Sequence, residues 1–202
     1  MNLRYVGESA LLVETEDAEQ AQALRRALLE LAIPGLRELV PGQSSLLIGA
    51  DPLSMDMDAL AAKLADLQLK AQRLAPREHE FLTEYCGDDL AAVAKFTGLE
   101  PAEVVRRHMS ATYEVAFLGF APGFAYLTGL DTVLRLPRRT EPRTRVPAGS
   151  VAIADGFTGI YPQASPGGWH ILGHASVKLF DASRAEPALL TPGDRVRFKV
   201  HP

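Results

Sequence analysis

The chain contains little of what many protein functions require, and its scarcest residue is cysteine. Cys86 is the only one, so no disulfide forms within the chain, and we expect a reducing, cytoplasmic setting. One uncharged stretch, residues 115–130, is 16 residues long but contains Pro122 and three glycines. A segment so short and so interrupted is a poor bilayer span, so we predict no membrane association.

Positive charge and enzyme motifs are scarce as well. The net charge of −4 gives no general basic face, so we expect no nucleic-acid partner. The sequence has no Gly-x-x-x-x-Gly-Lys-Ser/Thr, Gly-x-Gly-x-x-Gly or Gly-x-Ser-x-Gly motif, which excludes a P-loop, a dinucleotide fingerprint and a hydrolase elbow. His170 and His174 would lie roughly 13 Å apart in a strand, too far to share a metal bound at about 2 Å unless the chain turns at Gly173. We predict no metal site.

The first 77 residues show a periodicity that predicts a small α/β sandwich. The predicted elements are strands 3–6 and 10–14, a helix from Asp17 to about residue 33, strands 36–40 and 45–48, and a helix from Asp56 or Asp58 to residue 73. Asp17 is a suitable N-cap, and Pro34-Gly35 ends the first helix. Helices that cover one face of one sheet form such a sandwich, and this region contains no group of residues that carries chemistry.

From residue 78 to 202 the pattern changes to two short helices and then a β domain. Asp88 or Asp89 can cap a helix through residue 96, and Pro101 fits the first turn of a helix that ends near residue 109. The predicted strands are 113–119, 151–154, 158–161, 168–172, 176–180 and 195–200. Their regular spacing, with Gly and Pro in the turns, predicts a closed or sandwiched sheet. The predicted fold class is therefore α+β, with domains 1–77 and 78–202.

Three segments between residues 117 and 173 contain the candidate binding residues. This stretch holds 9 of the 16 glycines and 6 of the 14 prolines, which fix the backbone in turns. In the first segment, Phe120, Pro122 and Phe124 form either a ligand-facing wall or a core hairpin. In the third, Gly167-Gly168 precedes Trp169 and His170, which indicates either a stacking wall that a ligand approaches or a tight turn with a core tryptophan.

The second segment contains a cluster of arginines and ends in a serine. The arginines are Arg138, Arg139, Arg143 and Arg145. Guanidinium groups bind carboxylate or phosphate through paired hydrogen bonds, so we predict a pocket for an anion, with solvated surface charges as the alternative. Ser150 is either a hydroxyl contact in this pocket or an ordinary turn serine.

Together these segments resemble the KipI family, also called the allophanate hydrolase subunit 1 family. The matching stretches are FLGFAPGFAYL, PRRTEPRTRVPAGSV, TGIYP, SPGGW and PGDRVRF, with GESALLVE and PGQSSLLI in the N-terminal part. The resemblance covers essentially the whole chain and is strongest to the B subunits of bacterial ATP-dependent 5-oxoprolinases. It implies a ferredoxin-like N-terminal domain followed by a cyclophilin-like β-barrel.

The resemblance also implies a function. The chain would be a subunit, inactive alone, that helps open 5-oxo-L-proline to L-glutamate. Its implied partners are a C-type (KipA-like) subunit and an A-type (LamB/YcsF-like) subunit, and its substrate is a small carboxylate. The complex would use ATP, and this chain alone would bind no cofactor. The barrel face near Phe120, Arg138, Arg143, Ser150 and Trp169 would meet the partner and the substrate.

Two other functions are implied by the same family. A KipI-type inhibitor of a histidine kinase would share these motifs and catalyse nothing. Half of a biotin-dependent allophanate/urea carboxyltransferase would need biotin from another protein, because the chain has no Ala-Met-Lys-Met biotin site.

Overall fold

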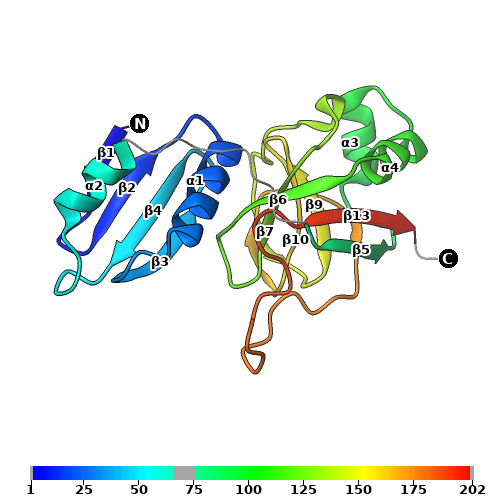
Figure 1. The fold of residues 1–202 in the computed structure, drawn as a ribbon. Helices are drawn as coiled ribbons and strands as arrows, with labels where there is room; N and C mark the ends of the chain where they lie inside the picture. The colour runs from blue at the N-terminus through cyan, green and yellow to red at the C-terminus, as the bar shows by residue number, and fades with distance from the viewer. Residues whose placement is uncertain (1, 66–75, 201–202) are drawn as a thin grey trace. The chain divides into compact units, whose positions relative to one another are not determined.

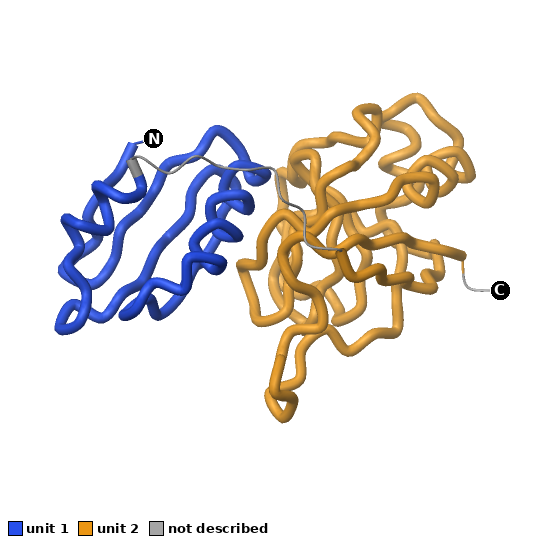
Figure 2. The backbone as a smooth tube through the Cα atoms, in the orientation of Figure 1, with its two compact units in different colours: residues 1–75 blue, residues 76–202 orange. Residues whose placement is uncertain are grey.

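The structure, a computed structural model, describes residues 2–65 and 76–200. The chain divides into two compact units, residues 1–75 and residues 76–202, which are coloured separately in Figure 2. Among the described residues, no helix combines the length and the apolar character needed to cross a bilayer.

The N-terminal unit is a four-stranded antiparallel sheet with two helices (Figure 1). Its elements are β1 (Asn2–Tyr5), β2 (Ala10–Glu14), α1 (Ala18–Glu30), β3 (Leu36–Pro41), β4 (Ser45–Ala50) and α2 (Met57–Ala65). The strand order β1-β2-β4-β3 is that of a ferredoxin-like sandwich whose edge strand comes first in the chain. The rest of the second predicted helix, residues 66–73, lies outside the described residues.

Local chemistry sets the ends of α1, and its apolar stripe sets its orientation. The Asp17 carboxylate accepts a hydrogen bond from the Gln20 amide at 2.8 Å, which satisfies a donor at the helix N-terminus. Gly35 adopts a φ of +84° just beyond the helix, a conformation that favours glycine. Leu24 and Leu28 are buried in the cluster that α1 shares with the sheet.

The C-terminal unit is a nearly closed barrel of seven strands with two short helices packed against it (Figure 1). The barrel strands are β5 (Glu78–Thr83), β6 (Tyr113–Leu118), β7 (Ala125–Thr128), β9 (Ser150–Ala154), β10 (Phe157–Ile160), β12 (His170–His174) and β13 (Arg195–Val200). The other elements are α3 (Leu90–Thr97), α4 (Pro101–Ser110), the 3-10 turn η1 (Thr132–Leu134) and a two-stranded sheet of β8 (Arg143–Val146) and β11 (Ser165–Gly167). The predicted α+β fold class is confirmed.

The order of the barrel strands explains why the sheet is only nearly closed. The strands follow one another as β12-β9-β10-β7-β6-β13-β5, so β12 and β5 are the two edges. A single antiparallel bridge between Glu84 and His174 joins those edges. The barrel therefore closes over a short stretch at and beyond this bridge, where the Gly87 amide also donates to the Leu172 carbonyl, rather than along a full ladder.

One predicted strand is wrong. Residues 176–180 alternate between apolar and polar side chains, yet they form no strand, and only Phe180 makes an isolated bridge, to Ala188. Leu179 is buried against the barrel core, so packing by a loop accounts for the alternation. Strands β5, β7, β8 and β11 are present in the structure without having been predicted from the sequence.

A directed chain of hydrogen bonds crosses the barrel interior. The Tyr85 hydroxyl donates to His108 Nδ1 at 2.7 Å, and His108 Nε2 donates to the Thr158 hydroxyl at 2.9 Å. Thr158 in turn donates to the Ala152 carbonyl at 3.0 Å. Burial lowers the pKa of His108 to about 3, so the imidazole is neutral at physiological pH and every proton in the chain has one acceptor. This network attaches α4 to the barrel.

Candidate functional site

The loop between β6 and β7 projects a phenylalanine into solvent. Its backbone closes on itself through bonds from the Ala121 amide to the Gly119 carbonyl (2.7 Å) and from the Phe124 amide to the Ala121 carbonyl (2.9 Å). Phe120 is held at a φ of +67° and is 60% exposed. A bulky residue in the left-handed region is strained, and such strain occurs preferentially at functional sites.

The exposed Phe120 ring is the tip of a buried aromatic cluster. It meets Phe124 edge-on with ring centroids 5.4 Å apart, and Tyr161 at 6.2 Å. Phe124 packs in turn against Trp169 at 5.3 Å. Phe124 is 1% exposed and Trp169 is 4% exposed, so neither offers a face to a ligand here. Of the two interpretations of the third segment, Trp169 therefore fits the tight turn with a core tryptophan. Through Phe124, it supports Phe120 from beneath.

Arg138 lies at the surface beside this cluster. Its Nε donates to the Asp155 carboxylate at 2.7 Å, and both side chains are about half exposed. Asp155 and Gly156 have φ values of +52° and +88° in the two-residue turn between β9 and β10, the Asp-Gly pattern of a tight hairpin. The hydrogen bond with Asp155 raises the pKa of Arg138, and the nearby Tyr126 and Tyr161 raise it further.

Arg143 and Arg139 have a different environment, because both bind a buried carboxylate. Asp89, whose side chain is 3% exposed, accepts from Arg143 at 2.8 and 2.9 Å, from Arg139 at 2.5 Å and from the Ile171 amide at 2.7 Å. Burial raises the pKa of Asp89, but the bond from Arg143 and the Ile171 amide outweigh it and leave that pKa below its ordinary value. These two guanidinium groups hold the arginine segment against α3 and β12. Asp88 lies 3.8 Å from Arg143, so the two positive charges face two carboxylates.

A hollow of about 290 Å³ lies beside the arginine segment. Its lining residues are Phe96, Leu136, Pro137, Arg138, Arg139, Thr140, Glu141 and His170. His170 Nε2 bonds to the Pro137 carbonyl at 2.9 Å and therefore carries the proton, while its Nδ1 is buried and without a hydrogen-bond partner among the described residues.

The predicted site residues thus fall into three groups. Phe120 and Pro122 are exposed on one loop, and Arg138 and His170 share the hollow. Arg139 also lines the hollow, but its guanidinium binds Asp89, and the remaining predicted residues do not line it. Phe124, Trp169 and Ser150 are buried, Arg143 is paired with Asp89, and Arg145 is exposed with no ion pair among the described residues. Substrate binding by these residues stays a prediction.

Sequence reasoning misses three residues of this site. The pattern indicates Asp89 as a helix cap, yet its carboxylate makes no cap hydrogen bond and binds arginine instead. Asp155 and Phe96 are not indicated at all. An Asp-Asp pair upstream of four clustered arginines is the one available signal for Asp89, because a buried guanidinium needs a carboxylate partner.

The fold and this site define a two-unit α+β protein, an α/β sandwich followed by a β-barrel that carries a cluster of arginines. The chain belongs to the family described as carboxyltransferase domain, subdomain C and D, whose model matches residues 1–190. It is 43% identical to the 5-oxoprolinase B subunit of Escherichia coli O157:H7 over 96% of this chain and 93% of that protein. It is 37% identical to the 5-oxoprolinase B subunit of Haemophilus influenzae over 99% of this chain and 98% of that protein. The family resemblance predicted from the motifs is confirmed.

Solved structures extend this likeness. The crystal structure of TTHA0988 superposes with a TM-score of 0.82 at 39% identity, covering all of this chain but 40% of that one. The chain thus spans about two fifths of the length of TTHA0988. The Kluyveromyces lactis urea carboxylase superposes with a TM-score of 0.74 at 21% identity, over 22% of its length, which shows a shared fold.

Proposed function

We propose that this chain is the B-type subunit of an ATP-dependent 5-oxoprolinase, which opens 5-oxo-L-proline to L-glutamate together with A-type and C-type subunits. The observation that carries the proposal is the nearly full-length likeness to proteins named as the B subunits of 5-oxoprolinases. Each of those matches covers at least 93% of the relative, so the likeness involves whole subunits rather than a shared fragment. The single cysteine supports a cytoplasmic complex.

In this proposal the exposed pair of Arg138 and Asp155 is the group that meets the substrate carboxylate. An exposed ion pair is worth about 0–1 kcal/mol, so a carboxylate ligand can displace Asp155 at little cost. The buried Arg143–Asp89 pair offers no such exchange, because separating it would leave a charge without a partner in the interior. Arg138 is therefore the arginine that can exchange its partner for substrate, and Phe120 would cover the bound ring.

We propose that ATP is bound mainly by the other subunits and that this chain binds no cofactor alone. The sequence has no P-loop, and its fold forms two fifths of the longer TTHA0988 chain. A subunit whose site residues lie on an exposed loop and in an open hollow needs a second polypeptide to exclude water from the reaction.

Reconstitution tests the proposed function. Purified A-type and C-type homologues should hydrolyse 5-oxoproline only when this chain is added, measured as glutamate and ADP formed. Arg138→Gln should lower kcat/KM at least about tenfold, because it removes a charge-assisted bond to substrate. Arg106→Gln is the matched control, since Arg106 is an exposed arginine of α4 bound to Glu103 and lies outside the hollow. Full turnover without this chain, or equal effects of both variants, would contradict the proposal.

The family description favours one second candidate, half of a biotin-dependent carboxyltransferase. The two activities separate cleanly in the same reconstitution. A 5-oxoprolinase forms glutamate with no biotin present, whereas a carboxyltransferase transfers labelled carboxyl groups from carboxybiotin. Transfer of label without glutamate formation would favour the second candidate.

A further inference from the structure

The barrel is sealed tightly on one side of the Glu84–His174 bridge. The Glu84 amide donates to the His174 carbonyl, and the His174 amide donates back to the Glu84 carbonyl, both at 2.8 Å. Beyond this bridge, the Gly87 amide donates to the Leu172 carbonyl at 3.0 Å. A Cβ on Gly87 or Gly173 would overlap the backbone opposite, so glycine is what allows the two segments to come this close.

On the other side of the bridge, β5 has an unpaired edge. The Arg195 amide donates to the Arg77 carbonyl, so the odd-numbered residues of β5 direct their backbone groups toward β13. Glu84 directs its groups toward His174, and alternation places the backbone groups of Glu78, Glu80 and Leu82 on that same outer side. Among the described residues, these three form no backbone hydrogen bond on the outer side, because β5 pairs with β13 alone.

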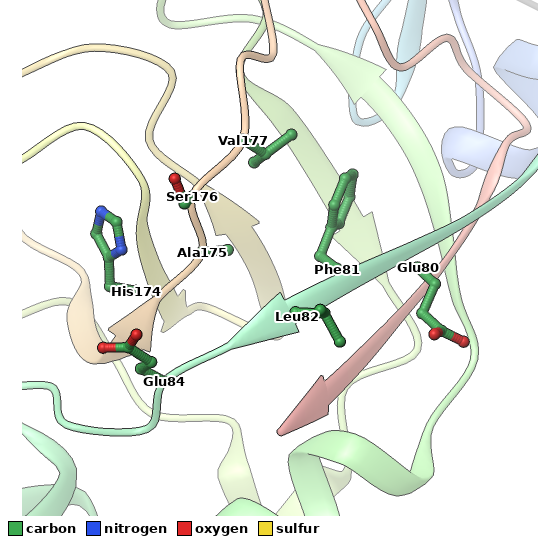
Figure 3. Close-up of a pocket in the computed structure, with 8 residues that line it drawn as sticks. All are labelled: Glu80, Phe81, Leu82, Glu84, His174, Ala175, Ser176 and Val177. Carbon is green, nitrogen blue, oxygen red and sulfur yellow. The ribbon is translucent and has the colours of Figure 1, made fainter. Parts of the chain in front are cut away.

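A cavity of about 390 Å³ lies along this edge (Figure 3). Its lining residues are Glu80, Phe81, Leu82, Glu84, His174, Ala175, Ser176 and Val177. Figure 3 shows β5 on one side and the segment after β12 on the other, diverging from the point where Glu84 faces His174. Phe81 and Ala175 belong to the buried barrel core, so the gap between the two segments reaches apolar side chains.

From this geometry we infer that the gap is a docking site for an extended segment of a partner polypeptide, which adds to β5 as an eighth strand. An unpaired strand edge supplies main-chain hydrogen bonds, and an adjoining pocket receives one side chain, which is the arrangement of β-augmentation sites. The inference rests on the proposed function, because the polypeptide that brings the segment is the C-type subunit.

Charge selects the occupant of this site. Glu78, Glu80 and Glu84 lie at even-numbered positions along the edge, so a second copy of β5 would bring carboxylates opposite carboxylates. Lys199 binds Glu80 at 2.7 Å and Arg195 binds Glu78 at 3.5 Å, whereas Glu84 forms no ion pair among the described residues. The incoming segment therefore carries a lysine or arginine that reaches Glu84, and self-pairing of the edge is disfavoured.

Hydrogen exchange read by mass spectrometry tests the inference without any mutation. The amides of Glu78, Glu80 and Leu82 should exchange rapidly in the free protein and become protected in the complex with a C-type homologue. If the complex forms and hydrolyses 5-oxoproline while these amides exchange as before, the inference is overturned and the proposed function stands. If no complex forms, both fail together.

A proline variant gives an independent test. Leu82→Pro removes only an amide on the outer side, so the β5–β13 ladder is kept, and proline is tolerated at such edge positions. Its affinity for the C-type homologue should fall about tenfold, as expected when one main-chain bond is lost and the carbonyl that faces it is left unpaired. Leu82→Thr, which keeps the amide, is the matched control and should bind nearly as the parent does. Equal binding by a folded Leu82→Pro variant would overturn the inference.

Discussion

The two units of this protein build their interiors differently. The N-terminal unit has an aliphatic cluster of leucine, isoleucine and valine contributed by β2, β4 and both helices. The C-terminal unit contains every buried aspartate and histidine of the described residues, namely Asp89, His108 and Asp194. An aliphatic core tolerates volume-conserving change, whereas a buried charge depends on its particular partner. The unit that holds all the candidate site residues is therefore the one most sensitive to single polar substitutions.

Removing a buried carboxylate is the most direct test of the sensitivity of the C-terminal unit to polar substitution. Asp89→Asn leaves Arg143 and Arg139 without their partner, so the free energy of unfolding should fall by about 3–5 kcal/mol. Asp155→Asn breaks the exposed pair with Arg138 and should cost about 0–1 kcal/mol. Urea denaturation of both variants measures the difference, and similar losses would show that burial of Asp89 does not matter.

Acid should destabilise the C-terminal unit through His108. Its pKa is about 3 in the folded protein, against an ordinary value of 6.5, so the unfolded chain binds more protons between these limits. Stability is therefore unaffected by this group above pH 6.5 and falls as the pH drops below that value, by about 1.4 kcal/mol per pH unit. Urea unfolding at about pH 6.5, 5.5 and 4.5 measures this slope.

His108→Gln is the matching variant, because an amide can bond to both Tyr85 and Thr158 without titrating. It should lose the slope between about pH 6.5 and 4.5, whatever its stability at neutral pH. His174→Gln, which changes an exposed histidine, should keep the slope of the parent. A parent protein with flat stability over this range would contradict the buried, neutral state of His108.

Phe120→Ala separates function from stability. The side chain is exposed, so unfolding should change by less than about 1 kcal/mol, whereas turnover in the reconstituted complex should fall at least about tenfold, as for an aromatic hot spot. Leu53→Ala, which removes a 97% exposed leucine from the N-terminal unit, is the control and should leave turnover intact. Unchanged turnover in Phe120→Ala would remove this loop from the site.

The smallest expected effect concerns the N-terminal unit. Asp17→Ala removes the cap of α1 and should lower stability by about 1 kcal/mol, with no change in turnover. Asp17→Asn, which keeps a capping oxygen, should retain most of that stability. A fall in turnover with Asp17→Ala would show that this unit contributes to the reaction after all.

Sequence reasoning succeeds where local chemistry decides structure. Caps, turns and periodicity predict the strand and helix order of the N-terminal unit, and Pro101 marks the first turn of α4. In the C-terminal unit the short strands β7, β8 and β11 carry no alternating pattern long enough to identify, and their pairing comes from tertiary contacts. Residues 176–180 show the reverse, because they have the pattern of a strand without a neighbour to pair with.

The site is predictable as residue types but not as an arrangement. Composition indicates arginines, aromatic residues and turns in one stretch, and the structure places Arg138 and His170 around one hollow. Composition does not indicate that Arg143 binds Asp89, 54 residues earlier, or that Phe124 packs against Trp169. Those outcomes depend on which segments meet in three dimensions, and one chain's periodicity does not contain that information.

The bonds of the Asp89 carboxylate also constrain the order of events during folding of the C-terminal unit. Its three partners are 50, 54 and 82 residues away along the chain, so this set of bonds cannot form until most of the barrel has been synthesised and has collapsed. Until then trypsin-like proteases can cleave the loop that contains Arg138 to Arg145. Resistance of that loop to cleavage is therefore a direct report that the barrel has closed.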